Sequence, residues 1–139
     1  SRMSYYCFLV TTVFISLGGV SYLICPTVMP YHKQAIGLNW SDLNNGLQIL
    51  LISSVKVTAA GAINTSIACF ALLFFAKHQK WSKYFLLILP IIWLLPLLII
   101  AVFISKETGA NAPWQIPALL IIVVLTGFAF SFRHTTRGR

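Results

Sequence analysis

A long apolar run, Leu47 to Ala76, constrains the fold of this chain more than any other stretch. Its 30 residues contain no acid and a single base, Lys56. A helix needs only about 20 predominantly apolar residues to cross the hydrocarbon core of a bilayer. The run therefore predicts a membrane-spanning helix, with residues left over at the end that precedes Lys56.

Composition extends this prediction to the whole chain. Of its 139 residues, 58% are hydrophobic and 9% are charged, whereas soluble domains carry about 25% charged residues. We therefore predict an all-α membrane protein, in which residues 1–139 form a single transmembrane domain with a four-transmembrane-helix bundle. The apolar stretches place the four spans at residues 5–24, 55–76, 84–104 and 116–132.

The residues just before the second span leave two arrangements open. Leucine or valine recurs at helical spacing from Leu43 to Val55, and Ser41 or Asp42 is suited to cap a helix that begins there. Residues 42–54 could form a short interfacial helix on the outer leaflet that bends into the span. They could equally belong to one long tilted helix.

The distribution of basic residues gives the orientation, because cytoplasmic loops carry an excess of Lys and Arg. Seven bases fall at the N-terminus, in the turn after span two and in the C-terminal tail: Arg2, Lys77, Lys80, Lys83, Arg133, Arg137 and Arg139. Three fall on the other side: Lys33, Lys56 and Lys106. We therefore expect both termini in the cytoplasm. A net charge of +8 would suit nucleic-acid binding, but we predict none, because the bases lie at the ends of apolar spans rather than on one face.

Small and polar residues form a row along span two. Gly61, Thr65 and Cys69 follow one another at four-residue steps, a spacing that lets two helices approach closely. Asn64 is placed to hydrogen-bond across such a contact. The row predicts helix packing at Gly61, Thr65 and Cys69, and it is either an ordinary packing seam or one wall of a small ligand pocket.

Lys56 has two alternative positions. From Lys56 to Lys77 the chain advances 21 residues, about 31 Å along a helix at ~1.5 Å per residue, which matches the thickness of the hydrocarbon core. Lys56 could therefore snorkel into the outer headgroups. Alternatively, it lies deeper and pairs with an acid or with backbone carbonyls, which would mark a functional site.

The outer loops supply the other candidate residues for a ligand site. His32, Asp42 and Glu107 would lie on the same side as Lys56, with Trp114 beside them. Our candidate ligand-binding set is therefore Lys56, Asn64, His32, Asp42, Glu107 and Trp114. The spacing of the histidine and the two acids is arbitrary for metal coordination, so we predict no metal site.

Several chemistries lack the residues that they need. No predicted span holds an Asp, Glu, His or Arg in its interior, although a proton-coupled pump normally needs an intramembrane carboxylate. The three cysteines, Cys7, Cys25 and Cys69, form no CxxC pair, and there is no glycine-rich nucleotide loop. We therefore predict no catalytic residues and no cofactor.

The order of these motifs resembles that of a known group. Along the chain come Pro30-Tyr31-His32, Lys56 with Gly61, the basic turn with Trp81, and Pro113-Trp114. This layout looks like that of small bacterial four-helix integral membrane proteins of uncharacterised function, and its plan is similar to that of DoxX-like proteins. The resemblance implies a four-helix bundle in a bacterial inner membrane. It implies no activity and brings no catalytic residue to this chain.

Two classes of function are consistent with these residues. The first, which the sequence favours, is a non-enzymatic membrane subunit whose partners are the lipid bilayer and either another membrane protein or a second copy of the chain. The second is a binder or carrier of a small or lipidic ligand, with its site near Lys56 between spans two and three. A polar cavity that reaches Lys56 would favour the second class, and a dry, fully packed bundle would favour the first.

Overall fold

The computed structural model describes residues 1–132, and every regular element in that range is helical. The chain runs through α1 (Arg2–Ile24), α2 (Pro30–Ile36), the short 3-10 helix η1 (Trp40–Asp42), α3 (Asn45–Phe75), α4 (Ser82–Thr108) and α5 (Gln115–Phe130). The predicted all-α class is confirmed. The tail bases Arg133, Arg137 and Arg139 lie outside the described residues.

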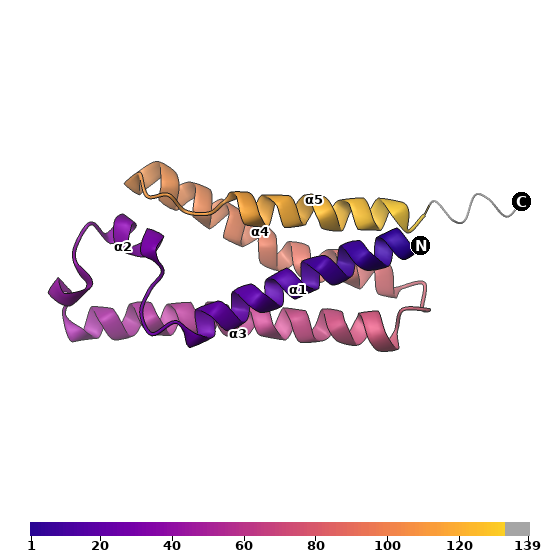
Figure 1. The fold of residues 1–139 in the computed structure, drawn as a ribbon, viewed down its shortest axis with the longest axis horizontal. Coiled ribbons are helices and arrows are strands. Elements are labelled where there is room, and N and C mark those ends of the chain that lie inside the picture. Colours follow the sequence, from indigo (N-terminus) through magenta and orange to yellow (C-terminus); the bar gives the residue numbers. More distant parts are fainter. Residues whose placement is uncertain (133–139) are drawn as a thin grey trace, which may run out of the picture.

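The four longer helices run up and down as a bundle (Figure 1). Helix α1 packs against α3 and α5, and α4 packs against the same two helices. The turn at 76–81 lies at the same end as the start of α1 and the end of α5, while α2 and the loop at 109–114 lie at the opposite end (Figure 1). We call these the terminal end and the loop end of the bundle.

Three of the described helices, α1, α3 and α4, are long and apolar enough to cross a membrane, judged by length and composition. Helix α5 is equally apolar in character but has only 16 residues. The chain is thus a helical protein of the membrane-spanning type, and a fourth span remains a prediction.

Helix α3 decides between the two arrangements expected before span two. It is continuous over 31 residues, about 46 Å at ~1.5 Å per residue, so it exceeds the ~30 Å hydrocarbon core. A separate helix over 42–54 is therefore wrong, and the single long helix is what forms. The expected cap at Ser41 or Asp42 is also wrong: the Asn44 side chain accepts a hydrogen bond from the Leu47 N–H at 2.8 Å, so the helix begins at Asn45.

The first loop contains a helix that the sequence analysis did not predict. Pro30 occupies the first turn of α2, where its missing N–H costs nothing. Gly37 ends the helix in the left-handed conformation, with φ of 70°, which glycine adopts without steric cost. Helix α2 packs back towards α4 and so covers the loop end of the bundle.

The core is made of two clusters of buried residues, and each takes side chains from all four long helices. The buried residues of α3 alternate at four- and three-residue steps: Val55, Ala59, Ala62, Ser66, Cys69 and Leu73. A Cβ atom added to Gly19 of α1 would lie 3.0 Å from the Ala62 Cβ, so the two helices are in close contact there. The buried hydroxyls of Thr12 and Ser66 donate to the carbonyls of Phe8 and Ala62 in their own helices, and so cost little inside the bundle.

Candidate functional site

A cavity of about 210 Å³ lies inside the bundle, towards the loop end. Residues of α1, α2, α3, α4 and α5 line it, among them Gly18, Tyr22, Tyr31, Thr58, Trp93 and Ile116. Its walls are largely aliphatic and aromatic side chains. Helix α1 lies close to α5 at the terminal end and diverges from it towards the loop end (Figure 1), so the cavity occupies the wider part of the bundle.

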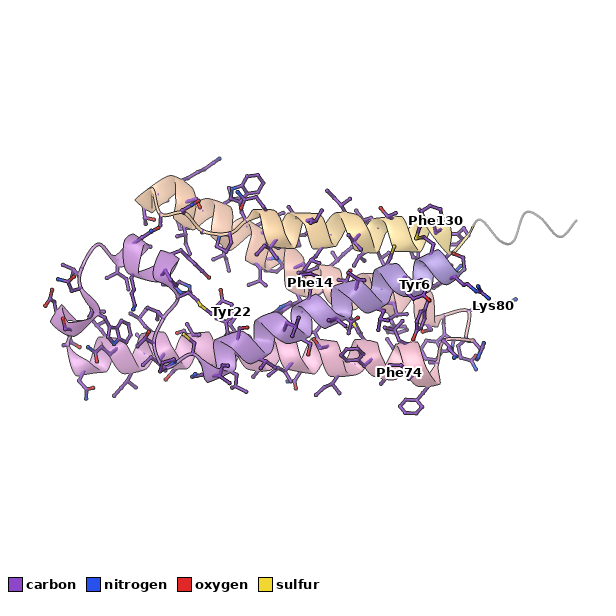
Figure 2. All side chains as sticks on the ribbon, in the orientation of Figure 1. Tyr6, Phe14, Tyr22, Phe74, Lys80 and Phe130 are labelled. Atoms are coloured by element: carbon purple, nitrogen blue, oxygen red, sulfur yellow. The ribbon has the colours of Figure 1, made fainter. Side chains whose placement is uncertain are left out.

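The polar edge of this cavity is a pair of tyrosines. The hydroxyl of Tyr22, near the end of α1, is hydrogen-bonded to the hydroxyl of Tyr31 in α2. Burial raises the pKa of the Tyr31 phenol, and the hydrogen bond to Tyr22 raises it further. Figure 2 shows Tyr22 and Phe14 projecting from α1 on the side where α2 and α5 lie. A ligand in the cavity would thus meet neutral hydroxyls at one end and hydrocarbon elsewhere.

One hydrogen bond stabilises α2 itself, and another joins it to the loop at 109–114. The Met29 N–H donates to Nδ1 of His32 at 3.2 Å, which stabilises the first turn of the helix. The backbone N–H of Asn111 donates to Oε1 of Gln34 at 3.1 Å. The first outer loop and the second therefore meet through Gln34 and Asn111.

Lys56 satisfies the carbonyl groups at the end of α1. Its ammonium donates to the backbone carbonyl of Cys25 at 2.7 Å, to that of Leu23, and to that of Tyr22 at 3.5 Å. The side chain is half-buried. Of the partners that the sequence left open for Lys56, backbone carbonyls are the ones that the structure contains, and the depth of the side chain in the membrane stays a prediction. Lys56 does not line the cavity, but it holds the helix that does.

The other charged candidates lie apart from Lys56. Asp42 is exposed and accepts a hydrogen bond from the Asn39 side chain at 2.9 Å within the first loop. Glu107 and Trp114 are exposed, and His32 is half-buried on α2. Burial lowers the pKa of His32. Within residues 1–132, no three His, Cys, Asp or Glu side chains gather as a metal site would require.

The small residues of α3 face different neighbours. A Cβ added to Gly61 would lie 2.5 Å from Cζ3 of Trp93 in α4, whereas Cys69 is buried in a cluster with Phe8 of α1. Thr65 donates its hydroxyl to the Gly61 carbonyl at 2.9 Å. Asn64 is exposed on the outward side of α3. Gly61 therefore packs against α4 and Cys69 packs against α1, while Asn64 lies on the surface of the bundle.

Sequence reasoning missed the cavity-lining residues, although one signal was available. Trp93 lies in the middle of an apolar helix, while tryptophan in membrane proteins is enriched at the two interfaces. A tryptophan in that position needs room from a neighbouring helix, and Gly61 provides it. Helices α3 and α4 are therefore in close contact at Gly61 and Trp93, and Trp93 also lines the cavity.

These features define an all-α protein of the membrane-spanning type with an apolar internal cavity. Comparison of the sequence and structure with protein families, with curated proteins and with solved structures found no match. The similarity in plan to DoxX-like proteins therefore stays a prediction.

Proposed function

We propose that the chain is an integral membrane protein of four spans that binds a small apolar or lipidic ligand in its internal cavity. The observation that carries this proposal is the 210 Å³ apolar space edged by the Tyr22 and Tyr31 hydroxyls. The bundle is not fully packed, which argues against a purely structural role. The cavity is largely apolar and Lys56 does not line it, so the ligand should be mainly hydrocarbon.

The size of the cavity limits the ligand. An engineered apolar cavity of ~150 Å³ in another protein stays dry and binds benzene. The 210 Å³ available here is large enough for one aromatic ring or a short segment of an acyl chain, but too small for a complete lipid. A ligand with a hydrogen-bonding group could in addition contact the hydroxyls of Tyr22 and Tyr31.

The entrance faces the bilayer between α1 and α5. Gly18 lines the cavity, and a Cβ added to it would have no atom within 4 Å. Phe14 of α1 and Ile116 of α5 also line the cavity and are exposed. A hydrophobic ligand dissolved in the membrane could enter sideways past Gly18 without crossing water.

Helix α5 is the fourth span in this proposal. Its 16 residues give about 24 Å at ~1.5 Å per residue, a little less than the hydrocarbon core. It packs along α1 and α4, both of which are long enough to cross, and exposed Trp114 precedes it as an interfacial anchor. The lysines of the 76–83 segment favour a cytoplasmic position for the terminal end. The DoxX-like plan would make the membrane a bacterial inner membrane.

Photocrosslinking tests the ligand site. Phosphatidylcholine with a diazirine at the end of one acyl chain should label the peptides that contain Thr58 and Trp93 in reconstituted protein. Gly18→Phe should reduce this labelling several-fold because the new ring fills the entrance. Leu17→Phe, on the exposed side of the same helix, is the matched control and should leave it unchanged. Equal labelling of both variants would contradict the proposal.

A membrane-subunit role is the second candidate, and Asn64 supports it. Its amide is exposed midway along α3 and has no hydrogen-bond partner among the residues that the structure describes. An unpaired amide facing lipid is costly, and a partner helix would satisfy it. Asn64→Leu should then reduce crosslinked or co-purified oligomer in mild detergent, while Val57→Leu on an exposed neighbouring turn should not.

A further inference from the structure

A second and larger cleft lies at the terminal end of the bundle. It measures about 640 Å³ and opens between the 76–81 turn, the first turns of α1 and the end of α5. Its lining is much more polar than that of the internal cavity and includes Ser4, Lys77, Lys80, Ser82, Lys83 and Ser131. Lys80 is labelled at this end of the molecule in Figure 2.

The cleft carries positive charge that no side-chain carboxylate offsets. Asp42 and Glu107 are the only acids in the sequence, and both belong to the loop end, in η1 and in the last turn of α4. One of the lysines is also held in place: Nζ of Lys83 lies 3.6 Å from the centre of the Phe132 ring, a cation–π contact. The local field therefore favours an anion.

A buried hydroxyl beside these lysines is unsatisfied. Ser82 is 2% exposed, and within residues 1–132 its Oγ has no hydrogen-bond partner. Ser82 is also the first residue of α4, whose N-cap Trp81 makes no side-chain cap and whose first turn holds no acid. The positive end of the α4 helix dipole therefore lies beside the unpartnered hydroxyl.

We propose that this cleft binds a phosphate group, presented by an anionic lipid headgroup or by a soluble phosphate compound. A phosphate has several acceptor oxygens and at least one negative charge. It can therefore accept a hydrogen bond from the Ser82 hydroxyl, beside the positive end of the α4 dipole, while it neutralises Lys77 and Lys80. Basic pockets between membrane helices on the cytoplasmic side bind headgroups of this kind. The site is separate from the internal cavity and does not depend on the ligand proposed there.

The test measures thermal stability of the full chain in nanodiscs, because a ligand of the folded state raises Tm. One arm compares phosphatidylcholine nanodiscs with nanodiscs that also contain increasing phosphatidylglycerol. The other adds inorganic phosphate to phosphatidylcholine nanodiscs at constant ionic strength. A saturable rise in the first arm alone identifies a lipid headgroup, and a rise in the second identifies soluble phosphate. No saturable rise in either arm overturns the proposal.

Ser82→Ala separates a built site from general surface charge. The variant keeps every charge, and it removes an unpartnered hydroxyl, so the fold should tolerate it. The substitution should weaken the apparent affinity for phosphatidylglycerol or phosphate about tenfold, the loss expected for a hydrogen bond to a charged group. Lys77→Gln with Lys80→Gln should weaken it further, whereas Lys33→Gln with Lys106→Gln, an equal charge change at the loop end, should not. Wild-type affinity in Ser82→Ala, or equal losses in the two double variants, would refute the site.

Discussion

The ammonium group of Lys56 donates a hydrogen bond to the backbone carbonyl of Cys25, 2.7 Å away, so a lysine of α3 closes the end of α1. Helix α1 stops at Ile24, and the last carbonyls of any helix lack intrahelical partners. Near a membrane these groups need a donor, and the negative end of the helix dipole favours a cation. The ammonium group of Lys56 thus gains hydrogen-bond acceptors, and the last carbonyls of α1 gain a donor.

The first prediction is that Lys56→Met destabilises the protein. The methionine keeps the apolar stem but donates nothing, so the carbonyls of Leu23 and Cys25 lose their partner. We expect a loss of about 1–3 kcal/mol in the free energy of unfolding, the cost of leaving a buried acceptor without its donor. Denaturant titration in detergent micelles, followed by circular dichroism, measures it.

Two variants identify the partner of Lys56. Lys56→Arg keeps the charge and several donors, so it should retain most of the stability. Glu107→Gln should change nothing, because Glu107 is exposed and shares no contact with Lys56 in the described structure. If Lys56→Met left the free energy of unfolding unchanged, or if Glu107→Gln restored it in the Lys56→Met variant, the contact with the carbonyls would not be what stabilises the protein.

The Lys56 contact shows where sequence reasoning reaches its limit. The acids can be counted in the sequence, and both were considered as partners for the lysine. Backbone carbonyls exist at every residue, and which of them are free depends on where α1 ends and how α3 passes it. The apolar runs predicted the long helices because length and composition alone decide whether a helix can cross a bilayer. The direction of a single side chain requires the packed bundle.

The cavity could not be predicted for a similar reason. Its walls come from four long helices and from α2, and it exists because α1 and α5 diverge. Four-residue spacing identified Gly61 as a packing position but could not indicate that its neighbour is Trp93. Helix α2 was overlooked because its seven residues are too few for a periodic pattern, although Pro30 and Gly37 mark its ends.

The second prediction concerns the contact between Gly61 and Trp93. In Gly61→Leu, the new side chain would overlap the Trp93 ring, since even its Cβ would lie 2.5 Å from Cζ3. We expect a destabilisation of about 1–3 kcal/mol from overpacking. Gly18→Leu is the control: its Cβ meets no atom within 4 Å, so its melting temperature in detergent should equal that of the wild type. Equal effects of the two substitutions would place the Gly61 face against lipid.

The third prediction is the orientation in the membrane. In a Cys25→Ser background, a cysteine at exposed Asn111 should react with a membrane-impermeant maleimide in intact cells, and one at exposed Gln79 should react only after lysis. The reason is the excess of lysine in the turn that contains Gln79. Asn111 is a better probe than Gly109, whose φ of 69° would strain a cysteine. Labelling of Gln79 but not of Asn111 in intact cells would reverse the topology.

The fourth prediction is that acid loosens α2 through His32. Nδ1 of His32 accepts a hydrogen bond from the Met29 N–H, which requires the neutral ring. Burial lowers the pKa of His32 in the folded state, so the unfolded state binds more protons between that lowered value and about 6.5. The stability that neutral His32 contributes should therefore be fully present above pH ~6.5 and be lost as the pH decreases through this window.

Thermal unfolding at about pH 8 and about pH 5 tests this directly. Wild-type protein should lose a few degrees of Tm on acidification. His32→Gln should lose much less, because its amide oxygen can accept from Met29 at either pH. His78→Gln, a change at an exposed histidine of the terminal end, should behave as the wild type does. If His32→Gln kept the full acid sensitivity, or if His78→Gln abolished it, protonation of His32 would not be the event that releases α2 from the roof of the cavity.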